Sequence, residues 1–148
     1  MRPIRLLTLF ALVTTACGTA APADNSCPAT PPSFATFKKS FLPKTCALSD
    51  SCHNANGHKG SLDLETDPYK AIINVGTFCM DPCMTAKTDY PTRVVPGDSA
   101  KSFFYVKMAM SVATDAKLGD RMPQSSFPID AATLKQWQCW IDAGAPNN

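Results

Sequence analysis

The chain has 148 residues, of which 45% are hydrophobic and 18% are charged, and 14 basic residues stand against 12 acidic ones. This length fits one domain with its own core, and the low charged fraction argues against general disorder. The formal net charge of +2 disfavours a nucleic-acid-binding protein, which needs a strongly basic surface. Seven cysteines are many for a cytosolic protein and typical of an exported one.

The N-terminal segment predicts export. Two arginines precede the apolar run 6–13, which is too short for a permanent membrane span and fits a signal peptide. Small residues then lead directly into Cys17, a pattern that resembles the bacterial lipobox, in which the cysteine is acylated after cleavage. We therefore expect a lipoprotein signal peptide over residues 1–16 and a lipid anchor on Cys17. Ordinary cleavage further on, near residues 21–23, is the alternative.

Export places the mature domain in an oxidising compartment. We expect it on the periplasmic side of a bacterial membrane, held there by its N-terminal lipid. Thr19 lacks the acidic character of some inner-membrane retention signals, which favours the outer membrane. Residues 17–32 are rich in Ala, Pro and Thr without periodicity, which predicts a flexible tether. The folded domain is then expected over residues 33–148.

Hydrophobic spacing and capping residues predict helices joined by long loops. The expected helices run from the N-cap Ser33 to Pro43, from the N-cap Asp67 to Gly76, over residues 100–113, and from the N-cap Asp130 to Gly144. The segments 46–60, 79–91 and 119–123 are irregular in pattern. The expected fold class is therefore all-α, a small helical domain with long loops.

One short segment carries a recognisable chemistry. A cysteine directly before a histidine, with a second cysteine upstream, is the order in which proteins hold c-type haem, and Cys46, Cys52 and His53 have this order. The thiols would add to the haem vinyl groups and the imidazole would reach the iron. Five residues separate the two cysteines, more than in the common spacing, so the spacer must bulge outward. A Cys46–Cys52 disulfide, with His53 merely exposed, is the alternative.

Residues 34–146 resemble the planctomycete-type cytochrome c domain of exported bacterial proteins. The likeness is carried by the cysteine–histidine site and by the segments 60–64, 93–102, 121–123 and 129–146. The resemblance implies a small cytochrome-c-like fold that holds haem c. Cys46 and Cys52 would be the thioether anchors, His53 the proximal ligand of the iron, and Met122 the distal ligand, whose thioether raises the iron potential.

The resemblance also implies how the ends of the domain meet. In a cytochrome-c-like fold the terminal helices pack together, so a Cys27–Cys139 disulfide is reasonable. Such a bond would close a long loop and stabilise the domain by roughly 4 kcal/mol.

Other residues of the chain could also supply ligands. Met108 and Met110 lie in a predicted helix and are expected in the core. His58 could complete a bis-histidine site, but a solvated loop residue is the better interpretation. Zinc at Cys46, Cys52, His53 and His58 matches no strong zinc pattern. Cys79 and Cys83, with methionines beside them, could attract copper(I), whereas a local disulfide between the two is the expectation.

These interpretations predict a one-electron carrier with an unidentified redox partner protein. Paired carboxylates, a serine–histidine arrangement and a glycine-rich phosphate loop are absent from the sequence, so we expect no enzyme activity. The alternative is a haem-free binding or structural lipoprotein of the same fold, held together by disulfides.

Overall fold

The computed structural model of the chain describes residues 26–78, 84–124 and 128–148. The expected signal peptide and its anchor Cys17 lie outside these residues, as do Cys79 and Cys83. Among the residues described, no helix is both long enough and apolar enough to cross a membrane.

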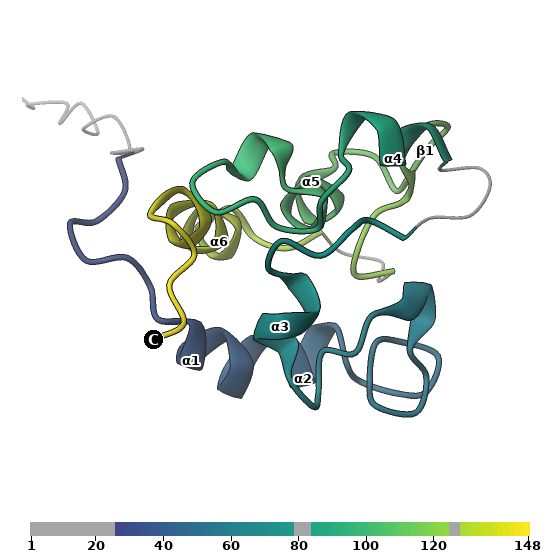
Figure 1. Cartoon of the computed structure of the whole chain (residues 1–148), viewed down its shortest axis with the longest axis horizontal. Coiled ribbons are helices and arrows are strands. Elements are labelled where there is room, and N and C mark those ends of the chain that lie inside the picture. Colours follow the sequence, from purple (N-terminus) through teal and green to yellow (C-terminus); the bar gives the residue numbers. More distant parts are fainter. Residues whose placement is uncertain (1–25, 79–83, 125–127) are drawn as a thin grey trace, which may run out of the picture.

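Short helices joined by loops form most of the molecule (Figure 1). In chain order the helices are α1 (Phe34–Thr36), a π-helix (Phe37–Phe41), α2 (Leu42–Thr45), a 3-10 helix (Lys59–Ser61), α3 (Pro68–Ile72), α4 (Met84–Asp89), a 3-10 helix (Ser99–Lys101), α5 (Phe103–Ala109) and α6 (Ala131–Asp142). Two strands, β1 (Thr114–Asp115) and β2 (Gly119–Asp120), pair antiparallel with Thr114 opposite Asp120.

The expectation of an all-α fold is wrong, because the fold is mixed. About 40% of it is helical and about 9% lies in strands and bridges, including the small antiparallel sheet. Outside β1 and β2, Ile73 bridges to Val94 and Gly76 bridges to Thr92. These segments satisfy their backbone groups across the chain rather than within a helix. Hydrophobic periodicity does not reveal pairings this short.

The first helical segment starts where the sequence predicts and ends later. The side chain of Ser33 accepts a hydrogen bond from the N–H of Ala35 at 3.2 Å, which confirms it as the N-cap. Pro43 does not end the segment. It lies in the first turn of α2, where the missing N–H of a proline costs little. The helical path therefore continues to Thr45.

Tertiary contacts also move the ends of the other helices. Asp67 caps α3 through the N–H of Lys70 as predicted, but α3 ends at Ile72 because the next residue enters the bridge to Val94. The helix expected over 100–113 is divided into a 3-10 turn and α5, and α4 lies within the segment 79–91, which is irregular in sequence. Only α6 matches its expected start and, closely, its end, with Asp130 accepting from the N–H of Thr133.

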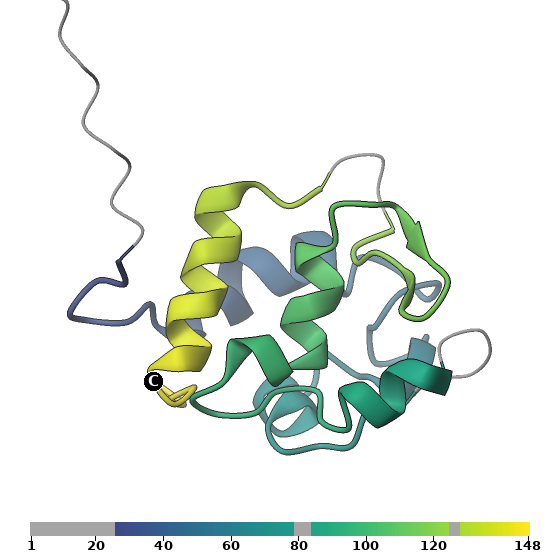
Figure 2. The ribbon, with the colours of Figure 1, turned by 90° about the horizontal axis from the view of Figure 1, so that it is seen from above.

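The core forms where the first and last helices meet. Phe37 stacks on Trp137 with ring centroids 4.0 Å apart, and Phe34 stacks on Trp140 at 5.1 Å. In Figure 1, α5 and α6 lie above α1, α2 and α3, and Figure 2 shows α5 beside α6. The buried core residues are Phe34, Phe37, Leu42, Cys46, Leu64, Ile72, Val94, Met108, Trp137, Trp140, Ile141 and Ala145. The terminal helices therefore pack together, as the resemblance implies.

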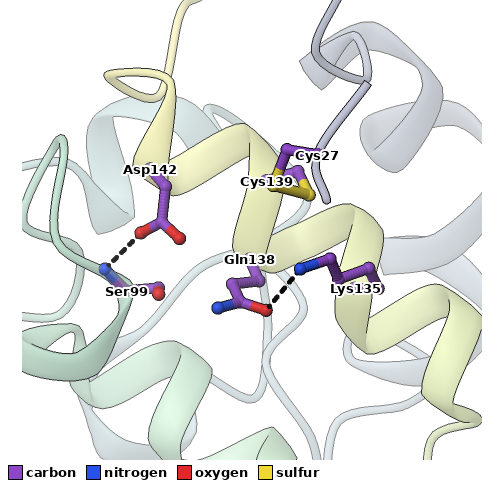
Figure 3. The surroundings of a disulfide bond; sticks show 6 residues. All are labelled: Cys27, Ser99, Lys135, Gln138, Cys139 and Asp142. Carbon is purple, nitrogen blue, oxygen red and sulfur yellow. Dashed lines mark hydrogen bonds between the residues drawn. A yellow bond between two sulfur atoms is a disulfide. The ribbon is translucent and has the colours of Figure 1, made fainter. Parts of the chain in front are cut away.

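A disulfide joins Cys27 to Cys139, as the resemblance led us to expect (Figure 3). It ties the segment before α1 to the C-terminal half of α6, with the two Cα atoms 5.4 Å apart. One turn further along α6, the carboxylate of Asp142 accepts a hydrogen bond from the N–H of Ser99 at 2.9 Å. These two connections fix α6 to both the N-terminal segment and the turn that precedes α5.

Candidate functional site

One pocket of about 310 Å³ brings together Cys46, His53 and Met122. The loop 46–64 forms one part of its wall, and α5 with the segment 119–124 forms another. In Figure 1 the loop after α2 belongs to the lower part of the molecule and α5 to the upper part, so the pocket lies between them. Its apolar side chains are Leu62, Leu64, Phe78, Phe103, Phe104 and Met108.

Backbone hydrogen bonds close the loop 46–64 on itself. The N–H of His53 donates to the carbonyl of Cys46 at 3.0 Å, and the N–H of Leu64 donates to the carbonyl of His53 at 2.7 Å. Gly57 passes so close to Asp50 that a Cβ atom would collide with the Asp50 backbone, so only glycine fits there. The loop therefore holds His53 at a defined place although it contains little regular structure.

The imidazole of His53 is oriented by the backbone. Its Nδ1 lies 2.8 Å from the carbonyl oxygen of Lys59. A carbonyl can only accept, so Nδ1 carries the proton and Nε2 keeps its lone pair. Partial burial lowers the pKa of His53, which favours the neutral ring. A neutral imidazole whose Nδ1–H donates to a carbonyl is the usual state of a metal-binding histidine.

Met122 follows the β1–β2 hairpin and is held against α5. Its N–H donates to the carbonyl of Lys107 at 3.0 Å, and the N–H of Arg121 donates to the carbonyl of Ala113 at 2.7 Å. The Met122 side chain is half-buried and lines the pocket. The structure thus brings Met122 to the same pocket as His53.

The two cysteines of the loop lie in different surroundings. Cys46 lines the pocket, is 8% exposed, and burial raises the pKa of its thiol to about 11. Cys52 does not line the pocket. Its Sγ lies 3.5 Å from Oγ of Ser49, and that hydrogen bond is the largest cause of its lowered pKa. Both are free thiols, so the Cys46–Cys52 disulfide is not formed.

The five-residue spacer bulges into solvent, but it does not bring both thiols to one pocket as haem attachment requires. Ala47 N–H donates to the carbonyl of Leu42 at 2.9 Å, and Cys52 N–H donates to the carbonyl of Ser49 at 2.9 Å. Between these bonds Leu48 is 65% exposed. The bulge accounts for why Cys52 lies at the surface while Cys46 is buried.

The rival ligands lie as the sequence predicts. Met108 and Met110 are buried, although Met108 also reaches the pocket wall. His58 is exposed, with its Nε2 3.8 Å from Oδ2 of Asp63. Across the described parts of the chain, no three His, Cys, Asp or Glu side chains gather closely enough to hold a metal ion.

Sequence reasoning missed Arg93 and Lys107, two buried cations that line the same pocket. Arg93 lies in one of the segments that carry the family resemblance, but nothing in its neighbourhood predicts burial. Lys107 stands in a helix where a lysine is usually solvated.

Comparisons of the chain with models of protein families, with curated proteins and with solved structures find no match.

Proposed function

We propose that this protein is a c-type cytochrome that carries single electrons on the periplasmic side of a bacterial membrane. Its haem would be held through the thiols of Cys46 and Cys52, and His53 and Met122 would bind its iron. The observation that carries the proposal is that His53 and Met122, which are far apart in the chain, line one pocket together with Cys46.

The donor set of the pocket fits a haem. His53 presents an imidazole whose Nδ1 is already bonded to the Lys59 carbonyl, which leaves Nε2 to bind a metal. Met122 supplies the thioether and Cys46 a thiol, and most of the remaining wall is apolar. Haem bound in this way supplies one-electron chemistry at its iron, and a methionine ligand raises the potential of that iron.

The residues around the donors have separate tasks. Phe103, Phe104 and Leu64 would exclude water, which keeps the environment of the pocket apolar. At the rim, Phe78 and Lys59 are exposed. An exposed rim lets an electron reach a partner protein without opening the fold.

Cys52 is the anchor that must move. Its Sγ lies beside Ser49 outside the pocket wall, whereas attachment needs the thiol at the edge of the ring. Because Cys52 directly precedes His53, a rotation of its side chain away from Ser49 is the movement that the proposal requires. The exposed spacer leaves room for it.

The membrane anchor is proposed on the N-terminal sequence. Acylation of Cys17 after signal-peptide cleavage would tether the domain through residues 17–32. The basic run, the short apolar run and the small residues before Cys17 support this part of the proposal.

The experiment is export of the full chain in a bacterium that carries c-type maturation genes. We expect covalent haem staining and a cytochrome absorption spectrum, both lost in His53→Ala. Met122→Ala should abolish the weak methionine–iron charge-transfer band, whereas Met110→Ala, which removes a buried methionine outside the pocket, should preserve it. A colourless product, from a host that matures a control cytochrome, would reject the proposal in favour of a haem-free lipoprotein.

A further inference from the structure

Two buried cations stand in the wall of the pocket. Asp115 and Asp120 act on Lys107 without direct contact and partly offset the lowering of its pKa by burial. Arg93 is 8% exposed and Lys107 is 9% exposed. Neither forms a salt bridge with any residue that the structure describes. Burying a charge is costly unless its donors are satisfied, so what these two side chains bind shows what they stabilise.

Arg93 binds the turn that orients His53. Its Nη1 donates to the carbonyl of Ala71 at 2.8 Å, and its Nη2 donates to the carbonyls of Gly60 and Ser61 at 3.1 and 2.9 Å. The preceding carbonyl of this turn, that of Lys59, accepts the Nδ1–H of His53. The guanidinium and the imidazole therefore hold successive carbonyls of the same turn.

This turn needs an external constraint. His58 and Ser61 have positive φ values of 44° and 52°, and Gly60 has a φ of 63°. Positive φ is unfavourable for residues other than glycine and persists only when the surroundings enforce it. The two hydrogen bonds from Arg93 to Gly60 and Ser61 supply that enforcement, and the third, to Ala71, anchors the guanidinium to α3.

Lys107 makes a parallel connection on the methionine side. Its Nζ donates to the carbonyl of Leu118 at 2.8 Å, and its own carbonyl accepts the N–H of Met122 at 3.0 Å. One residue of α5 thus holds both ends of the segment 118–122. The Lys107 ammonium also lies 5.8 Å from the ring centre of Phe103, so it is fixed from two sides.

We propose that Arg93 and Lys107 are positioning residues for the two iron ligands. Arg93 fixes His53 through the turn 59–61, and Lys107 fixes Met122 through the segment 118–122. This inference rests on the proposed function. The rival role, in which these cations bind a carboxylate of the bound group, competes with the carbonyl contacts that they already make and is an outcome of the test.

The first arm uses the haem-free protein, so that it reports on Arg93 even where no haem is attached. Nitrogen-15 NMR should find His53 of the wild type with its proton on Nδ1. Arg93→Met should shift the ring toward a mixture of tautomers, and Arg93→Lys, which retains one charged donor, should give a smaller shift. An unchanged tautomer in a folded Arg93→Met protein would overturn the role of Arg93. Arg93→Lys decides the question where Arg93→Met does not fold.

The second arm uses the haem-loaded full chain and tests Lys107. Added imidazole displaces a methionine ligand, so its affinity measures how firmly Met122 is held. We expect imidazole to bind roughly 10-fold more tightly to Lys107→Met, with a smaller gain for Lys107→Arg. Lys117→Met removes an exposed cation near the same segment and should not change the affinity. Equal changes in imidazole affinity for Lys107→Met and Lys117→Met would show that Lys107 acts only through its positive charge, and would overturn its positioning role.

The two arms separate the inference from the proposed function. A wild-type protein without haem refutes the function, while the tautomer of His53 still tests Arg93. If the wild type carries haem, Arg93→Met and Lys107→Met can be compared with it directly. Unchanged iron ligands in both variants, with loss of a contact to a carboxylate of the haem, would support the rival role and overturn the inference.

Discussion

The ring of Phe37 lies flat on the indole of Trp137, with the centroids 4.0 Å apart and the planes inclined by 15°. Both side chains are buried, and the contact joins the π-helix of the N-terminal segment to α6. Phe104, which lines the pocket, packs against the same indole at 5.2 Å. The contact between the first and last helices therefore also supports the pocket wall.

Truncation of this stack should destabilise the fold. Phe37→Ala removes a buried ring and should lower the free energy of unfolding by about 3–5 kcal/mol. Lys39→Ala, at an exposed position of the same π-helix, should change it by less than about 0.5 kcal/mol. Denaturant titration followed by tryptophan fluorescence measures both, and similar losses in the two variants would contradict the packing described here.

The Cys27–Cys139 disulfide should contribute substantially to stability, because its cysteines are 112 residues apart in the chain. The Cys27→Ala/Cys139→Ala double variant should lose about 5 kcal/mol of unfolding free energy in the chain-entropy account. Reductant should lower the stability of the wild type toward that of the variant and should affect the variant much less. If reductant affects both proteins equally, the bond is not the source of the difference.

The two free thiols should react at very different rates in the haem-free protein. The thiolate is the reactive form, the pKa of buried Cys46 is raised to about 11, and the pKa of Cys52 is lowered by its hydrogen bond to Ser49. Iodoacetamide near pH 8 should therefore label Cys52 first. Peptide mass spectrometry after short exposures gives the order, and equal labelling of both residues would refute the burial of Cys46.

The same burial predicts how stability depends on alkaline pH. An unfolded cysteine ionises near pH 9.0, whereas Cys46 in the folded protein ionises near pH 11. The unfolded state therefore loses its proton first, so the contribution of Cys46 is complete below pH 9 and is lost as the pH rises to 11. Comparison of the wild type with Cys46→Ala in denaturant titrations across this range isolates the effect. Parallel pH profiles of the two proteins would show that the Cys46 thiol is not coupled to folding.

What could be predicted from the sequence depended on local interactions. Ser33, Asp67 and Asp130 cap helices through hydrogen bonds to N–H groups two or three residues away, and such contacts are written in short stretches of sequence. The end of α3 could not be predicted in this way. It depends on the bridge from Ile73 to Val94, a pairing between segments that lie far apart in the chain.

The candidate site likewise has a part that could be predicted from local sequence and a part that could not. The order of Cys46, Cys52 and His53 is visible in the sequence, whereas the placement of Met122 was expected only from a family resemblance. Arg93 and Lys107 could not be identified as part of the wall, because their partners are backbone carbonyls. Every residue has a backbone carbonyl, so the pattern of side chains in the sequence does not predict which carbonyls a buried cation will bind.

The proposed haem would bond covalently to the segment that ends at His53. The most direct test of this bond is peptide mass spectrometry of the full chain after export in a bacterium with c-type maturation genes. We predict that the peptide containing Cys46, Cys52 and His53 carries the mass of haem, with neither thiol free to react with iodoacetamide. The same peptide at its unmodified mass, with two reactive thiols or a Cys46–Cys52 disulfide, would contradict it.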